Sequence, residues 1–447
     1  MCGIVGYSGP KEPLPILIGG LSRLEYRGYD SAGIAVSDGS DITIEKKEGK
    51  LDVLKEHLAD KKIKGNIGIG HTRWATHGVP NDVNAHPHSD NSEDFAIIHN
   101  GIIENYAEMK DSLLKENYSF KSDTDTEVVA IELSKQWNGN LLETVVKVTK
   151  DLEGTYALVV TTTKQENTIV AGRMMSPLVL GVGEGEVFLA SDSAAILEHT
   201  NKMIFLENGD FVEIHDGNYK LFDADLNDIE REVQIIDWEV SEAEKSGHDH
   251  FMYKEILEQA EVIERTITGR LEEGSPEIPI TKEKAQKYEK IWIVACGTAY
   301  HAGLFGKDLF EKVLGVPVSV ELASEFRYRE PIIGENDLGI VISQSGETMD
   351  TIAATELLKE NGSHVLALVN VVGSSLARMA DSVFYLHVGP EIGVASTKAY
   401  LGMLVGQLLL AKHWDSNNKL DVSFEEIKGL PLLIEETLKC EPEVKEI

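Results

Sequence analysis

The sequence predicts a layered α+β domain followed by a doubly wound α/β domain. Three observations support this expectation. The chain has 447 residues, enough for two or three domains. Short apolar runs bounded by Gly, Asn and Asp, interspersed with helical patterns, occupy the first 240 residues. From Lys287 onward, an apolar run, a loop of small residues and a helix follow one another repeatedly, which is typical of a doubly wound sheet.

The first domain is expected to mix short strands with helices. The apolar runs that predict strands are residues 67–69, 95–98, 157–160 and 187–190. The helical patterns are residues 14–24, 106–116 and 126–136. Asp and Thr residues between Ser122 and Glu127 are candidate caps for the last helix. Because strands and helices do not alternate regularly, we expect α+β layers rather than a parallel sheet.

The second domain shows the regular alternation that the first lacks. Its expected strands are residues 291–295, 338–342, 365–369 and 383–388. Ligands of such sheets bind at the carboxyl ends of the strands, where loops rich in Ser, Thr and Gly lie in this chain. We expect four segments: a first domain at 1–240, a connection at 241–284, the α/β domain at 285–425 and a helical terminal segment at 426–447. Within the connection, a helix is expected from residue 252 to 270.

Composition excludes several classes of function. The formal net charge is −33, which disfavours nucleic acid and anionic membranes as partners. There is no run of 18 apolar residues and no secretory signal, so we expect a cytoplasmic protein. The three cysteines, Cys2, Cys296 and Cys440, are odd in number and widely spaced, so they suggest neither a disulfide framework nor a zinc site.

A cysteine in second position is a candidate nucleophile. Removal of Met1 would leave Cys2 with both a thiol and a free α-amino group. This amine has a pKa near ~8 and can accept the thiol proton, directly or through water, in place of a histidine base. The alternative is an incidental small residue at the start of a strand, and this motif alone does not decide between the two.

Further motifs in the same domain support the catalytic interpretation. They are Cys2-Gly3-Ile4-Val5-Gly6, Arg27-Gly28-Tyr29-Asp30-Ser31-Ala32-Gly33, His71-Thr72-Arg73-Trp74-Ala75-Thr76-His77-Gly78, His99-Asn100-Gly101 and Thr124-Asp125-Thr126-Glu127. In this order they resemble the glutaminase domain of the glutamine–fructose-6-phosphate aminotransferases (isomerising). The resemblance implies an N-terminal-nucleophile hydrolase fold with two antiparallel sheets between helical layers.

The resemblance also implies roles for individual residues. Cys2 would attack the side-chain amide of glutamine, and Asn100 with the backbone N–H of Gly101 would form the oxyanion hole. The planar guanidinium of Arg73 would pair with the α-carboxylate of glutamine. The remaining implied roles are assistance to Arg73 by Thr76 and His77, binding of the α-ammonium group by Asp125, and gating of an ammonia channel by Trp74.

Several histidines raise the question of a metal. They are His71, His77, His86, His88 and His99. Their spacing matches no structural zinc pattern, so we expect hydrogen-bonded core histidines and no metal. The resemblance implies no cofactor either.

In the second domain, the loop 343–348 (Ser-Gln-Ser-Gly-Glu-Thr) is a candidate phosphate cradle. It follows a strand and opens a helix, and Cys296-Gly297-Thr298 lies at the corresponding place one unit earlier. Backbone N–H groups and hydroxyls at a helix N-terminus suit a phosphate. The alternative is helix capping by Ser and Thr, although two such loops at neighbouring strand ends favour a ligand site.

The resemblance extends to this domain, which is similar to the first sugar-isomerase module of the same family. It rests on Cys296-Gly297-Thr298, Glu321-Leu322-Ala323-Ser324-Glu325-Phe326, the loop 343–348 and residues 389–400. It implies phosphate contacts from Thr298, Ser343, Gln344, Ser345 and Thr348, and sugar contacts from Ser396 and the backbone of Val394. Cys296 is expected to be a packed small residue rather than a nucleophile.

The chain departs from the family pattern in three places. Ala299 stands where serine is usual, which removes a hydroxyl near the phosphate, and Ala260 stands where proline is usual. No residues match the family's second sugar-isomerase module, so a fragment of a longer protein is expected. The implied reaction converts fructose 6-phosphate and glutamine to glucosamine 6-phosphate and glutamate, in a homodimer when full-length. The alternatives are an uncoupled glutaminase with a sugar-phosphate-binding module and a sugar-phosphate sensor without chemistry.

Overall fold

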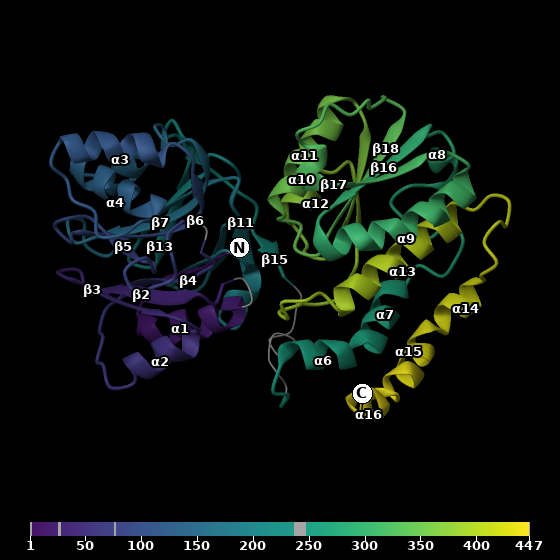
Figure 1. Ribbon diagram of the computed structural model, residues 1–447, viewed down its shortest axis with the longest axis horizontal. Helices are drawn as coiled ribbons and strands as arrows, with labels where there is room; N and C mark the ends of the chain where they lie inside the picture. Colours follow the sequence, from purple (N-terminus) through teal and green to yellow (C-terminus); the bar gives the residue numbers. More distant parts are fainter. Residues whose placement is uncertain (1, 26–27, 76, 237–246, 447) are drawn as a thin grey trace. The chain divides into compact units, whose positions relative to one another are not determined.

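The computed structural model describes residues 2–25, 28–75, 77–236 and 247–446. The chain divides into two compact units, residues 1–240 and 241–447. In the described part of the chain, the first unit contains two antiparallel sheets and the second a parallel sheet (Figure 1). The predicted fold class is therefore confirmed: antiparallel layers come first, and a doubly wound α/β domain follows.

One sheet of the first unit has eight strands among the described residues. In spatial order they are β15 (Gln234–Ile235), β11 (Lys202–Phe205), β9 (Val179–Val182), β10 (Val187–Ala190), β1 (Gly3–Ser8), β4 (Ile67–Arg73), β2 (Ser31–Ser37) and β3 (Ile42–Glu48). Side chains alternate between the two faces of a strand. On β1, Ile4 faces the other sheet, whereas Val5 and Tyr7 pack under α1 (Pro13–Leu24) and α2 (Leu51–Leu58). Both faces of β1 are therefore apolar.

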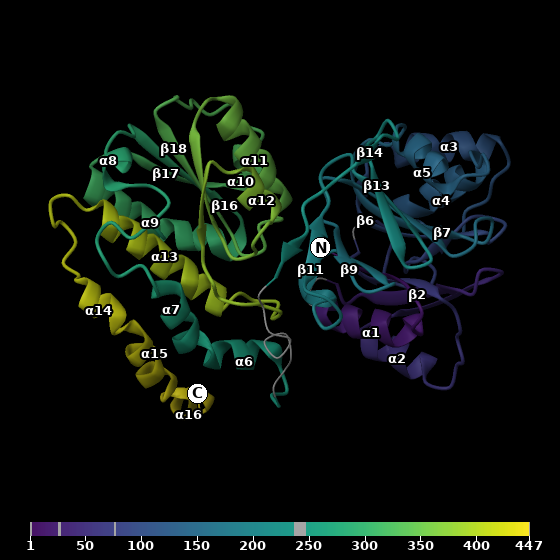
Figure 2. The ribbon, with the colours of Figure 1, turned by 180° about the vertical axis from the view of Figure 1, so that it is seen from behind.

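The second sheet packs its inner face against the first. Its strands in spatial order are β14 (Asp228–Ile229), β13 (Asn218–Phe222), β12 (Phe211–His215), β8 (Thr168–Met174), β7 (Gly154–Thr162), β6 (Phe95–Ile103) and β5 (His88–Ser89). On β6, Ala96 and Ile98 lie in the core between the sheets, and Phe95 and Ile97 face the helical layer. That layer consists of α3 (Tyr106–Lys115), α4 (Asp125–Lys135) and α5 (Leu141–Thr149), as Figure 2 shows.

The second unit contains a five-stranded parallel sheet. Its spatial order is β17 (Val318–Leu322), β16 (Lys290–Ala295), β18 (Asp337–Ser343), β19 (His364–Val369) and β20 (Ser382–Tyr385). The strand β17 was missed in the sequence analysis, because its side chains are mostly only half-buried and it lies at the sheet edge. The order reverses between β16 and β18, and ligands of open α/β sheets bind at such a switch point.

Helices cover both faces of this sheet. On β16, Ile291 and Ile293 face a core that includes α7 (Gln259–Ile267), α9 (Gly297–Leu314) and α13 (Lys398–Trp414). Trp292 and Val294 face α10 (Ala323–Phe326), α11 (Met349–Glu360) and α12 (Ser375–Met379). The other described helices are α6 (Phe251–Leu257), α8 (Lys282–Ala285), α14 (Phe424–Lys428), α15 (Leu430–Leu438) and α16 (Glu441–Lys445).

Part of the segment 241–284, expected to be a connection, contributes to this second unit. The predicted helix from residue 252 to 270 is two helices, α6 and α7, which meet at Glu258. Val262, Ile263 and Ile267 of α7 lie in the unit's main core. Residues 237–246 of the predicted connection lie outside the described residues.

Candidate active site

Cys2 lies immediately before β1, in contact with the residue that follows β4. The backbone N–H of Trp74 donates to the Cys2 Sγ atom at 3.2 Å. This contact arises because β1 and β4 pair antiparallel, with Gly3 opposite Thr72. Burial raises the pKa of the Cys2 thiol, and the hydrogen bond from Trp74 opposes that rise. The thiol therefore needs a base to become a thiolate at neutral pH.

Asn100 and Gly101 belong to β6 in the facing sheet. The Asn100 Nδ2 atom donates to the Cys2 carbonyl oxygen at 3.0 Å, so the two sheets meet at the predicted nucleophile. Gly101 has φ of +135°, and a Cβ atom built there would lie 2.0 Å from the Thr155 carbonyl oxygen on β7. Both the backbone conformation and the close approach of β7 require glycine at this position.

Arg73 is a buried cation at the end of β4, with one side of its guanidinium unused. Its Nη2 atom donates to the carbonyl oxygens of His77 and Gly78. Its Nη1 atom is buried and has no hydrogen-bond partner among the described residues. Burial lowers the pKa of Arg73, while charge interactions with Cys2 and Asp125 oppose this, so all three groups share one electrostatic environment. A buried unpaired N–H is costly unless a ligand uses it.

Asp125 begins α4, with its carboxylate pointing back toward β6. Its Oδ2 atom accepts from the Ile103 backbone N–H at 2.9 Å and lies 4.0 Å from His99 Nδ1. Thr124, predicted as a cap, occupies the N-cap position but makes no capping hydrogen bond with its side chain. Its hydroxyl instead lies 3.1 Å from His88 Nε2.

The other predicted glutaminase residues differ in how they are placed. Trp74 is 42% exposed, and its ring makes an edge contact with Tyr29 at 5.4 Å between centroids. His77 packs edge-on against Tyr106 at 5.2 Å, and its buried Nδ1 atom has no partner in the described part of the chain. Thr76 lies outside the described residues.

Four histidines near Asn100 are buried and contact one another: His71, His86, His88 and His99. The rings of His71 and His86 stack at 4.2 Å, and those of His86 and His88 meet edge-on at 4.7 Å. His71 Nε2 lies 3.0 Å from Asn100 Oδ1. Burial lowers the pKa of His71 to about 3, so it is neutral at physiological pH. No group of three or more His, Cys, Asp or Glu among the described residues could hold a metal ion.

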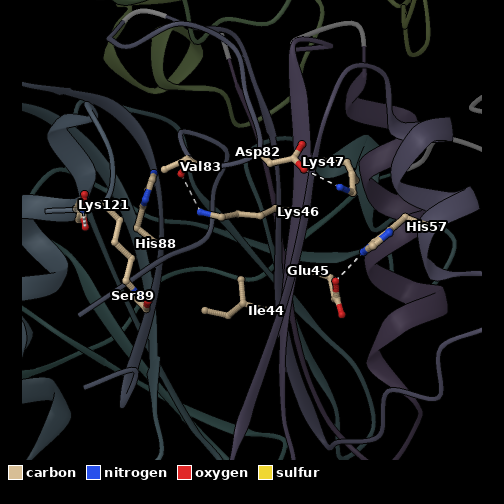
Figure 3. Close-up of a pocket in the computed structure, with 11 residues that line it drawn as sticks. Ile44, Glu45, Lys46, Lys47, His57, Asp82, Val83, His88, Ser89 and Lys121 are labelled. Atoms are coloured by element: carbon tan, nitrogen blue, oxygen red, sulfur yellow. Dashed lines mark hydrogen bonds and ion pairs between the residues drawn. The ribbon is translucent and has the colours of Figure 1, made fainter. Parts of the chain in front are cut away.

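A cavity of about 560 Å³ lies beside His88 (Figure 3). His88 lines it, together with Lys46, whose Nζ atom donates to the carbonyl oxygens of residues 83, 85 and 87 at 2.8–3.2 Å. Other polar groups in its wall contact each other: Lys47 pairs with Asp82 at 2.6 Å, and His57 Nε2 lies 2.8 Å from a Glu45 carboxylate oxygen. The cavity thus presents no excess of one charge, and the sequence analysis did not identify it.

In the second unit, two predicted phosphate-binding loops lie at the carboxyl ends of adjacent strands. The strands are β16 and β18, with Ala295 opposite Ile342, so both loops lie at the switch point of the sheet. The side chains of Cys296 and Thr348, at the N-caps of α9 and α11, make no capping hydrogen bond. Thr298 is exposed in the first turn of α9, and Cys296 is half-buried and packs against the apolar core, as expected for a small packed residue.

The loop 343–348 is ordered by hydrogen bonds between its own residues. Ser343 Oγ accepts from the Gly346 N–H at 3.0 Å and lies 3.1 Å from Thr348 Oγ1. Ser345 Oγ accepts from the Glu347 N–H at 3.2 Å, and the Gln344 carbonyl oxygen accepts from the next strand's loop, at Asn370 N, at 3.2 Å.

Gly346 has φ of +67°, and a Cβ atom there would lie 2.0 Å from Ser374 Oγ. That hydroxyl is buried without a partner among the described residues, although the sequence analysis assigned it no role.

The predicted sugar-contact residues lie on a loop that two buried carboxylates hold. Glu391 accepts from Ser396 Oγ at 2.9 Å and from the N–H groups of Thr397 and Ala399 at 2.8 and 3.0 Å. Glu255 of α6 accepts from the N–H groups of Ile392 and Gly393. Val394 at the tip is 68% exposed. The sequence analysis missed Glu391 and Glu255, and an acidic residue inside the Gly-Pro-Glu-Ile-Gly motif was the available signal.

Comparison with known proteins places these sites in a family context. The glutamine amidotransferase domain model matches residues 56–233, and the SIS domain model matches residues 285–412. The chain is 48% identical over 434 residues to a glutamine–fructose-6-phosphate aminotransferase (isomerizing) of Clostridium acetobutylicum, covering 96% of this chain and 71% of that protein. It is 50% identical over 441 residues to the protein of the same name from Caldanaerobacter subterraneus subsp. tengcongensis, covering 96% of this chain and 72% of that protein.

Among solved structures, the C-terminal domain of glucosamine-fructose-6-phosphate aminotransferase from Francisella tularensis is 39% identical. The match covers 45% of this chain and 60% of that chain, with a TM-score of 0.43. No helix in the described part of the chain is long and apolar enough to cross a membrane.

Proposed function

The chain belongs to the glutamine–fructose-6-phosphate aminotransferase family, and on this premise we propose that it releases ammonia from glutamine at Cys2 and transfers it to fructose 6-phosphate. The products are glutamate and glucosamine 6-phosphate. The observation that carries the proposal is the placement of Cys2, whose Sγ atom accepts from Trp74 and whose carbonyl oxygen accepts from Asn100. No metal or cofactor enters the proposed reaction.

Glutamine hydrolysis proceeds through a covalent intermediate on Cys2. The α-amino group that Cys2 acquires when Met1 is removed takes the thiol proton, and the sulfur attacks the side-chain carbonyl carbon of glutamine. The Asn100 Nδ2 group and the Gly101 N–H stabilise the resulting oxyanion. The C–N bond then breaks and ammonia leaves with the proton from the α-amino group. Water cleaves the thioester, which yields glutamate and restores the thiol.

The substrate is held by charged groups near Cys2. The unpartnered Nη1 atom of Arg73 supports its assignment to the α-carboxylate of glutamine, and Asp125 binds the α-ammonium group. Thr76 and His77 assist Arg73. We assign to Trp74 the gate through which ammonia leaves.

The second unit binds the acceptor sugar. Thr298, Ser343, Gln344, Ser345 and Thr348 hold the phosphate, and Ser396 and the backbone of Val394 contact the sugar. Support comes from hydroxyls and N–H groups at the starts of two helices, where no capping hydrogen bond uses the side chains of Cys296 or Thr348. We place the reaction in the cytoplasm, in a homodimer for the full-length form.

A second candidate function is glutamine hydrolysis uncoupled from transfer. The observation that favours it is that Cys2, Arg73 and Asn100 all lie in the first unit, residues 1–240. The chain spans 71–72% of the clostridial and Caldanaerobacter aminotransferases. In this case the second unit binds sugar phosphate without aminating it.

One experiment separates these functions. Glutamate and glucosamine 6-phosphate are measured after incubation with glutamine, with and without fructose 6-phosphate, for the wild-type chain and for Cys2→Ala. Release of both products by the wild type alone supports transfer, and release of glutamate alone supports the uncoupled function. A folded chain that lacks Met1 and releases no glutamate contradicts both.

A further inference from the structure

We propose that His71 is a positioning residue that fixes the orientation of the Asn100 carboxamide, so that its N–H group faces Cys2. This inference rests on the proposed glutaminase reaction and adds a residue to it. The starting observation is that the Asn100 side chain, only 7% exposed, is held at both ends. Its Nδ2 atom lies 3.0 Å from the Cys2 carbonyl oxygen, and its Oδ1 atom lies 3.0 Å from His71 Nε2.

The contacts of His71 determine where its proton lies. His71 Nε2 is 3.0 Å from the His99 carbonyl oxygen as well as from Asn100 Oδ1. A carbonyl oxygen can only accept, so Nε2 carries the hydrogen. The Nδ1 atom is buried without a partner in the described part of the chain, which fits the unprotonated nitrogen of a neutral ring. Burial lowers the pKa of His71 to about 3, so the ring keeps this form at working pH.

This tautomer excludes the flipped carboxamide. Rotation of the Asn100 amide by 180° would set Nδ2 against the Nε2–H of His71, two donors, and Oδ1 against the Cys2 carbonyl oxygen, two acceptors. Both ends therefore favour one orientation. An amide nitrogen carries two hydrogens, and only one is used by the Cys2 carbonyl oxygen. The other is available to the oxyanion that develops beside Cys2.

His71 can act as a fixed reference because its own position is constrained. It lies on β4 between two paired strands, opposite Ile4 of β1 and Gly33 of β2. Its ring is 1% exposed and stacks on His86 at 4.2 Å with an interplanar angle of 14°. Residues that do not contact substrate can orient those that do when they hold them with rigid hydrogen bonds, and His71 holds Asn100 in this way.

The test uses His71→Leu, which removes the donor, and His71→Gln, whose side-chain amide can restore one near the Nε2 position. We expect His71→Leu to lower kcat for glutamate release about 10-fold, with a KM for glutamine within twofold of wild type. Complete removal of an oxyanion donor lowers kcat about 10²–10³-fold, and a misoriented donor should lose only part of that stabilisation. His71→Gln should recover most of this loss. His88→Gln, a change in the same histidine cluster that does not contact Asn100, should stay near the wild-type kcat.

A double-mutant cycle distinguishes positioning from general disruption. If His71 acts through Asn100, His71→Leu should change kcat less than twofold in an Asn100→Ala background. An equal 10-fold loss in both backgrounds, or a wild-type kcat for His71→Leu, would overturn the inference. Neither result would affect the proposed hydrolysis of glutamine at Cys2, which fails if the folded wild-type chain without Met1 releases no glutamate.

A readout independent of activity is the tautomer itself. ¹⁵N NMR of histidine-labelled protein should show His71 as the neutral Nε2–H form from pH 5 to pH 9. A charged ring or an Nδ1–H tautomer in that range would overturn the inference.

Discussion

Replacement of Gly101 by alanine should destabilise the pairing of β6 with β7 in the seven-stranded sheet of the first unit. Two costs add. A non-glycine residue at φ of +135° costs of order 1–3 kcal/mol. The new methyl group would start 2.0 Å from the Thr155 carbonyl oxygen, whereas ordinary contact begins near 3.4 Å, and such overpacking costs about 1–3 kcal/mol. We therefore expect the free energy of opening β6 and β7 to fall by about 2–6 kcal/mol.

A matched control separates the two costs. Gly139 also has positive φ, +100°, but a Cβ atom there would meet nothing within 4 Å. Gly139→Ala should cost only the backbone term, about 1–3 kcal/mol. The assay is amide hydrogen exchange of peptides spanning 95–103 and 154–162, which reports opening of these strands. Peptides that include residue 139 report the backbone cost at the control site. The reasoning is refuted if Gly101→Ala lowers protection of 95–103 and 154–162 no more than Gly139→Ala lowers protection around residue 139.

Three further predictions concern the sites directly. Asn100→Ala should lower glutamine turnover about 10²-fold or more, as loss of an oxyanion donor does, and unchanged kcat would remove Asn100 from that role. Glu391→Ala should weaken fructose 6-phosphate binding by up to about 10²-fold in a titration, since loss of three hydrogen bonds of about 1 kcal/mol each frees the loop. Glu391→Gln, which keeps an acceptor, should weaken binding less, and equal affinities for both variants would contradict the loop's role. Because burial raises the pKa of the Cys2 thiol, its alkylation by iodoacetamide at pH 7 should be slower than that of a peptide cysteine, and its rate should rise beyond pH 9. Mass spectrometry of each cysteine measures these rates. A rate at pH 7 above that of the peptide would mean that the protein lowers the pKa of this thiol instead.

The fold could be predicted where apolar periodicity and burial agree. The runs at 95–98 and 291–295 belong to strands that are paired on both sides and are apolar on both faces, so pattern and structure coincide. β17 was missed for the opposite reason: it is an edge strand in which only the first residue, Val318, is buried. The helix expected from 252 to 270 is broken at Glu258, a residue with no helix-breaking signal, whose carboxylate accepts from Lys398 at 2.7 Å. Tertiary contacts of this kind are invisible to local patterns.

The residues proposed to contact substrate and the residues that hold them in place could be predicted from the sequence to different extents. The position of Cys2 in the chain suggested a nucleophile, and the family resemblance implied the roles of Arg73 and Asn100. These assignments stay predictions. The groups that hold them were not predicted. His71 was expected only to be a hydrogen-bonded core histidine, and Glu391 was not singled out. Their roles depend on which atoms they face, and that follows from strand register and loop conformation rather than from residue type.

The two units order their sites by different physical means. Around Cys2, order comes from strand pairing: β1, β4 and β6 are fixed in register, and the side chains that meet there leave β-sheet positions. In the second unit, the loops have no such ladder, so buried carboxylates substitute for it. Glu391, Glu255 and Glu347 accept backbone N–H groups that would otherwise be unpaired inside the protein. An acidic side chain in such a loop therefore orders the proposed phosphate site, because it accepts hydrogen bonds from the loop's own N–H groups.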